Sequence, residues 1–247
     1  MPKAVPATAA PSRAKAPALP EDVSGPLDAA IADLETGART WSHLTLDQRA
    51  RLLGRIRDSV ATVAEEWADV AATSKSLEPG HPLRGEEWLS GPYATLVAVD
   101  AYRSTLSALA KGESPLRGVK TDAAPGGRLR AHVFPLSPID GLLLSGYTGE
   151  VWFEPGVTEA QARRTAGLGQ LSPTEPGGVG LVLGAGNVTS IPVLDVIYEL
   201  MAHNRVVILK VNPTQDTMVP VYERALAPSS SRASCASCAA AETSAPT

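Results

Sequence analysis

The first half of the chain repeats its apolar residues at the three-to-four-residue period of amphipathic helices. The period runs from Asp22 to Gly37 and then continues behind Thr45 through a much longer segment. Thr45 and Gln48 have the form of a capping box, in which side chains satisfy the first free backbone N–H groups of a helix. A third helix is expected from Glu86 to about Lys111. Its inward positions are expected to be Leu89, Tyr93, Leu96, Val97 and Leu106.

The pattern then changes to short, strand-like segments that are separated by Pro, Gly and Ser. We expect strands or hairpins in "RLRAHVFPL", "DGLLLSG" and "EVWFEPG". Val179 to Leu183 is strand-like, Ser190 to about His203 is helical, and Arg205 to Leu209 is again strand-like. Such a strand–helix–strand unit predicts two parallel strands. The predicted fold class is therefore α/β, with N-terminal helices and a β-hairpin segment followed by an incomplete Rossmann-like parallel sheet.

Both ends of the chain differ in composition from the middle. Residues 1–22 are rich in Pro and Ala, and residues 228–247 contain no Leu, Ile, Val, Met or aromatic residue, so both are expected to be disordered. Between them we expect an N-terminal helical and β-rich region at 23–175 and a partial nucleotide-binding unit at 176–227. Because a doubly wound sheet has about five or six strands, the predicted sheet is incomplete. A truncation or a reading-frame shift is the expected origin.

Composition excludes several classes of partner. The chain is 44% hydrophobic and 19% charged with a net charge of −4, which gives no reason to expect a nucleic acid or an anionic membrane. No apolar run approaches the ~20 residues that cross a bilayer. With no export signal and two cysteines, the expected location is the cytoplasm.

The stretch "GAGNVT" behind the first predicted parallel strand is a candidate phosphate-binding turn. Gly184 and Gly186 fit the first two places of the dinucleotide fingerprint. Thr189 stands where the third glycine belongs, and the second strand ends in Lys210 where an acidic residue normally accepts from the ribose. The residues therefore disfavour the usual form of that fingerprint.

A different combination resembles the aldehyde dehydrogenase superfamily. Asn187 follows the first strand, Pro192 lies in a helix start made of small residues, and "VVILKVNP" forms the second strand. The segment "WSHLTLDQRARLLGRIRDSVATVAEEWADVAATSK" resembles the early helices of the same family. The resemblance runs from about Leu27 to Leu226 and is closest to a divergent branch, because the usual "PWN" is "AGN" here. It implies a nicotinamide-dependent oxidoreductase fold.

The resemblance assigns roles to individual residues. Asn187 matches the asparagine whose amide stabilises the oxyanion of a thiohemiacetal; from the residues alone, it could instead cap the next helix or adopt a turn conformation. Lys210 matches the lysine that hydrogen-bonds the adenosine ribose, with an ordinary strand-end lysine as the alternative. Gly184 and Gly186 complete the cofactor-binding set, and Pro213 stands where the family often has a glutamate. The implied cofactor is NAD or NADP, and the implied substrate is a small-molecule aldehyde.

The catalytic groups of that family are not matched. Its reaction uses a cysteine thiolate and a glutamate base that lie well beyond the second strand. Cys235 and Cys238 fall in the Ser/Ala tail, which offers nothing to lower a thiol pKa. We therefore expect the chain to lack the nucleophile and the base and to be inactive as given. The lone "CASC" has no second ligand pair for zinc, so no metal is expected.

Two other functions compete with this interpretation. The β-rich segment from Arg128 to Pro155 resembles the part of the family that projects strands for oligomerisation, so the chain could be a non-catalytic assembly partner or form a homo-oligomer. A small stand-alone nucleotide binder using Lys210 and the Gly184–Asn187 turn is the third hypothesis.

Overall fold

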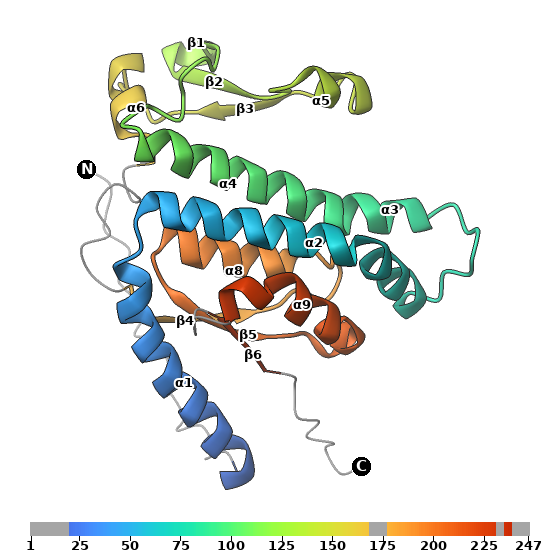
Figure 1. The fold of residues 1–247 in the computed structure, drawn as a ribbon. Coiled ribbons are helices and arrows are strands. Elements are labelled where there is room, and N and C mark those ends of the chain that lie inside the picture. The colour runs from blue at the N-terminus through green and yellow to red at the C-terminus, as the bar shows by residue number, and fades with distance from the viewer. Residues whose placement is uncertain (1–19, 168–176, 231–234, 239–247) are drawn as a thin grey trace, which may run out of the picture.

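The computed structural model describes residues 20–167 and 177–230 and the backbone of 235–238 (Figure 1). The predicted disorder of residues 1–19, 231–234 and 239–247 lies outside the described residues, whereas residues 21–22 and 228–230, which were also predicted to be disordered, are helical. The chain begins with α1 (Glu21–Ser42) and the long α2 (Leu46–Ser74). The predicted capping box is confirmed, because Thr45 Oγ1 accepts from the Gln48 N–H at 3.2 Å and Gln48 Oε1 accepts from the Thr45 N–H at 2.9 Å.

The third predicted helix is divided by a wider turn. It consists of α3 (Arg84–Trp88), a π-helical turn at Leu89–Tyr93 and α4 (Ala94–Ala110). A π turn adds a residue and rotates the following face relative to the expected period. Leu89 and Val97 were predicted to face inward and are instead 57% and 46% exposed. The buried positions of α4 are Thr95, Val99, Leu106 and Leu109.

The middle of the chain forms an antiparallel sheet with strand order β1-β2-β3. Its strands are β1 (Thr121–Ala123), β2 (Leu129–Phe134) and β3 (Gly149–Trp152), and α6 (Glu159–Thr165) follows them. The prediction of a strand at "DGLLLSG" is wrong, because its first residues belong to α5 (Pro138–Leu143). Ser137 and Asp140 form a capping box with Pro138 in the first turn, which favours a helix start.

The last part of the chain confirms the predicted parallel strands. β4 (Val179–Leu183) and β5 (Val206–Lys210) are joined by α8 (Ile191–Ala202) and run parallel from Val179↔Val206 to Leu183↔Lys210. A 3₁₀ turn (Pro213–Met218) and α9 (Val219–Ser230) follow. The backbone of β6 (Cys235–Cys238) pairs parallel with β5, so these four residues of the predicted disordered tail form a third strand. A segment with few apolar side chains can form a strand here because its backbone N–H and C=O groups pair with those of β5.

A single core joins the helices to the parallel sheet. In Figure 1, α2 lies between α4 and the layer of α8 and α9, with the β4-β5-β6 sheet beyond them. The antiparallel sheet lies on the other side of α4. The fully buried core residues include Trp41, Trp67, Ile56, Leu200 and Tyr222, which come from both halves of the chain. None of the helices in the described ranges combines the length and apolarity needed to cross a bilayer. The α/β fold class is confirmed.

Candidate functional site

The glycine turn and Lys210 lie at the same edge of the parallel sheet. β4 and β5 are in register at Leu183↔Lys210, so both strands end at this point. The Gly184 N–H donates a hydrogen bond to the Lys210 carbonyl at 2.9 Å, which fixes the start of the turn to the end of β5. α8 begins at Ile191, just beyond the turn. Ligands of open α/β sheets bind at such an edge, outside the carboxyl ends of the strands.

Both glycines of the turn are required by close packing. A Cβ at Gly184 would lie 3.2 Å from Pro192 Cγ and 3.3 Å from the Lys210 carbonyl oxygen. A Cβ at Gly186 would lie 2.7 Å from Thr214 Oγ1 and 2.9 Å from Asn212 Cγ. Neither glycine has a positive φ. The two glycines therefore allow close packing, of Gly184 on Pro192 and the end of β5 and of Gly186 on the Asn212 and Thr214 side chains, rather than an unusual turn conformation.

Asn187 is an exposed residue in the middle of this turn. It does not cap α8, because the N-cap is Ser190 and no side chain forms a cap hydrogen bond there. It also lacks the positive φ of a left-handed turn residue. The helix-cap alternative is therefore wrong, whereas Asn187 does lie in a bend of the turn, without the left-handed conformation that asparagine tolerates. Its amide forms no hydrogen bond within the part of the chain that the structure describes, so it is available to donate to a ligand.

A buried network holds the start of α8 from two sides. The Trp67 indole N–H on α2 donates to Thr189 Oγ1 at 2.9 Å. The Tyr222 hydroxyl on α9 donates to the Thr189 carbonyl at 2.8 Å and lies 2.7 Å from Gln215 Oε1. Burial raises the pKa of Tyr222, so the hydroxyl keeps its proton at neutral pH. Thr189, which the fingerprint comparison treats as a mismatch, is the residue that fixes the turn.

The segment after β5 completes the edge. Asn212 Oδ1 accepts from the Thr214 N–H at 3.1 Å, and the Thr214 hydroxyl donates to the Gly186 carbonyl at 2.9 Å. Sequence reasoning missed this contact. An asparagine followed by Pro213 at the first helical position is a recognisable cap signal that could have located it. Lys210 is partly exposed and has no ion pair within the described residues.

The part of the tail that carries the two cysteines reaches this edge of the sheet. β6 pairs with β5 at Lys210↔Cys238, so the backbone of Cys238 lies beside the end of β5. The orientation of the Cys235 and Cys238 side chains lies outside the described part of the structure. Within residues 20–167 and 177–230, no group of three or more His, Cys, Asp or Glu side chains is arranged to hold a metal ion.

The comparisons with known proteins are sparse. No family model matches the chain, and no curated protein matches it. Among solved structures the chain is similar to a crystal structure of bifunctional proline utilization A (PutA) protein, with 16% sequence identity and a TM-score of 0.46. The similarity covers 95% of this chain and 18% of that one, so the chain spans less than a fifth of that protein. No activity or cofactor follows from a likeness at this level.

Proposed function

We propose that the edge formed by the ends of β4 and β5 binds NAD or NADP, and that the chain is an aldehyde dehydrogenase-like nucleotide-binding chain. The observation that supports this most is the direct contact between the Gly184 N–H and the Lys210 carbonyl, which brings the two motifs of the sequence resemblance to one edge. Asn187, three residues after Gly184, has an exposed side chain, and Lys210 forms no ion pair within the described residues.

The two polar residues would perform different tasks. Lys210 would donate to the adenosine ribose, and it could equally well neutralise a 2′-phosphate, so both nucleotides are candidate ligands. The positive end of the α8 dipole lies beside the turn, which favours a phosphate there. Asn187 would donate to the oxygen of a bound carbonyl compound. We propose nucleotide binding without aldehyde oxidation, because the sequence resemblance matches neither the cysteine nor the glutamate of the family's reaction.

The decisive experiment is calorimetric titration of the purified chain with NAD and with NADP. Lys210→Ala is expected to weaken binding about tenfold, because it removes one charge-assisted hydrogen bond to the nucleotide. Lys111→Ala, at the end of α4, removes a lysine far along the chain from this edge and should leave binding unchanged. Failure of the wild-type chain to bind either nucleotide, or equal binding by both variants, refutes the proposal.

An activity assay tests the second half of the proposal. We expect no aldehyde-dependent formation of NADH or NADPH by the wild-type chain. Turnover that is abolished by Cys235→Ser together with Cys238→Ser would show that the tail supplies the nucleophile, and it would overturn the inactive assignment.

A second candidate function is assembly through the antiparallel sheet and α5. Seven large apolar side chains between residues 136 and 152 are exposed, and most of them are more than half exposed. The seven are Leu136, Ile139, Leu142, Leu143, Tyr147, Val151 and Trp152. Such a concentration is typical of surfaces that bind another protein. We propose that this surface binds a second copy of the chain or a related subunit.

Light scattering coupled to size exclusion tests the assembly proposal. The wild-type chain is expected to form an oligomer, and Leu142→Asp, at a side chain that is 79% exposed, is expected to shift it to the monomer. Leu83→Asp is the matched control, because Leu83 is 54% exposed in the α2–α3 connection and should not change the mass. A monomer at every wild-type concentration contradicts the proposal.

A further inference from the structure

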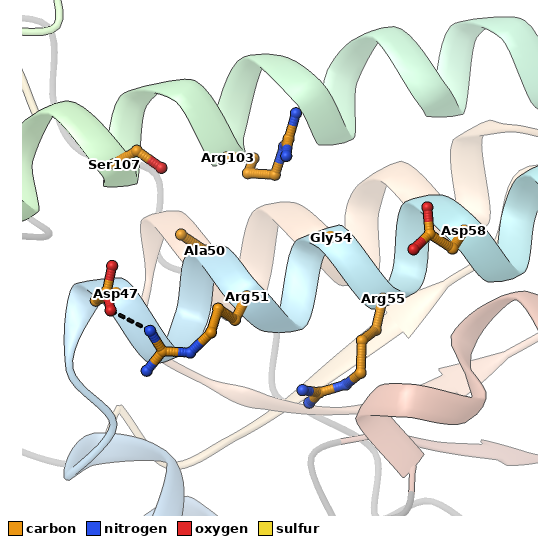
Figure 2. A pocket seen from close by; sticks show the side chains of 8 residues that line it. All are labelled: Asp47, Ala50, Arg51, Gly54, Arg55, Asp58, Arg103 and Ser107. Atoms are coloured by element: carbon orange, nitrogen blue, oxygen red, sulfur yellow. Dashed lines mark hydrogen bonds and ion pairs between the residues drawn. The ribbon is translucent and has the colours of Figure 1, made fainter.

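An open groove of about 440 Å³ lies between α2 and α4, on a different part of the molecule from the nucleotide edge. Its base contains the small residues Ala50 and Gly54, and a Cβ at Gly54 would lie 4.0 Å from Arg103 Cδ. Figure 2 shows Arg103 and Ser107 of α4 over these small residues, while the Arg51 and Arg55 side chains extend from α2 on the side away from α4. The groove is therefore lined by two pairs of residues four apart, one pair on each helix.

The guanidinium groups of the groove differ in how well they are neutralised. Arg51 forms an ion pair with Asp47, and Arg103 forms one with Asp100 at 3.2 Å. Asp100 is also bound by Arg57 at 3.1 Å, so it would keep a cationic partner if Arg103 turned away. Arg55 has no ion pair or hydrogen bond within the described residues.

A count of the local charges leaves one positive charge in excess. The groove and its immediate ion pairs hold four guanidinium groups and three carboxylates. They are Arg51, Arg55, Arg57 and Arg103, with Asp47, Asp58 and Asp100. The chain as a whole carries a net charge of −4, so this local excess is opposite in sign to the protein. Two incompletely neutralised guanidinium groups beside one groove favour a small anion.

We propose that this groove binds a phosphate group, either as inorganic phosphate or as the end of a small phosphate monoester. The planar guanidinium fork matches the oxygen spacing of a phosphate, and both Arg55 and Arg103 are exposed on long side chains that can turn toward a ligand. The Ser107 hydroxyl, one turn after Arg103, supplies a further donor. The groove is independent of the proposed nucleotide edge, since it shares none of that edge's residues.

The test is calorimetric titration with inorganic phosphate and with phenyl phosphate, at an ionic strength held constant with sodium chloride. Wild-type protein is expected to bind both, and Arg55→Gln combined with Arg103→Gln is expected to weaken binding at least about tenfold. The control Arg39→Gln removes an exposed arginine whose side chain donates only to Thr36 within the described residues, and it should bind as the wild type does. All four substituted side chains, including Lys210 below, are at least partly exposed, so circular dichroism should show an unchanged fold.

The same titration separates this groove from the nucleotide edge. Lys210→Ala should keep the full phosphate response, whatever its effect on NAD or NADP. Equal binding of the two probes indicates free phosphate as the ligand, and tighter binding of the ester indicates a phosphorylated metabolite; either outcome supports the site. Absence of binding, or a response lost in Lys210→Ala and kept in the double arginine variant, overturns it.

Discussion

Removing the Tyr222 hydroxyl tests whether α9 fixes the nucleotide edge. The side chain is 1% exposed, and its ring packs edge-on against Trp67 with a centroid distance of 5.4 Å. Tyr222→Phe keeps that ring and its packing while it deletes the donor to the Thr189 carbonyl. The substitution therefore isolates one polar contact at the start of α8, with no cavity of any size.

The magnitude follows from what the deletion leaves behind. The Thr189 carbonyl loses its 2.8 Å donor, and the Gln215 side chain loses its 2.7 Å neighbour, while both residues remain buried. An unsatisfied buried polar group costs about 1–3 kcal/mol. We expect a loss of about 2 kcal/mol in the free energy of unfolding. For a chain of this size that corresponds to a decrease in Tm of roughly 4–8 °C.

Urea denaturation and thermal unfolding measure this loss, with Tyr198→Phe as the matched control. Tyr198 lies on α8 and is 49% exposed, so its substitution should change stability by less than about 0.5 kcal/mol. If the edge binds nucleotide, Tyr222→Phe should also weaken that binding, because the turn before α8 loses one of its two anchors. A Tyr222→Phe protein as stable as the control would refute the network as a source of rigidity.

Three further expectations concern the rest of the fold. Thr45→Ala removes the helix cap of α2 and should cost about 1 kcal/mol in urea denaturation, whereas Thr45→Ser should cost much less. Arg49 is fully buried, its Nη2 donates to Asn204 Oδ1 at 2.7 Å, and its guanidinium lies 4.6 Å above the Trp41 ring. Arg49→Lys, which lacks the planar group that stacks on this ring, should destabilise the chain by about 1–3 kcal/mol; an unchanged urea midpoint would contradict this. The hydrogen bonds from Arg130, and then from His132, hold the pKa of Asp122 well below its usual range. The stabilisation from Asp122 is therefore complete above about pH 4, the ordinary aspartate pKa, and is lost only as the pH falls toward the lowered folded pKa. Carboxyl NMR should show no Asp122 titration near pH 4, and a normal midpoint would contradict the arrangement.

Local signals predicted the elements well, because their causes lie within a few residues. The capping box at Thr45 and Gln48 needs only a helix start, and it was identified correctly. The parallel strands on either side of α8 follow from a pattern that spans about 30 residues. The face of α4 was not predictable in this way. Gly91 has φ −105° and ψ −106° inside the π turn, and a Cβ there would lie 2.9 Å from Trp67 Nε1. Pro92 lies inside this turn and Gly91 packs against Trp67 of α2, so the change of face depends partly on a residue distant in the sequence, which no local period can reveal.

Spacing in the sequence located part of the candidate site but did not reveal the role of Thr189. The sequence identified Gly184, Gly186 and Lys210 through their spacing, and the structure brings them to one edge. Spacing also marked Thr189 as a failure of the glycine pattern, whereas its side chain and carbonyl are the anchors for α2 and α9. A third glycine normally allows close packing of a helix on its strand. A glycine at this position would remove the acceptor for the Trp67 indole and leave a buried N–H unsatisfied. The departure from the fingerprint is therefore tied to the long α2 helix, whose core is continuous with that of the parallel sheet. The early helices of the chain and the edge proposed to bind nucleotide are thus one structural unit, and changes in α2 should alter the turn that carries Asn187.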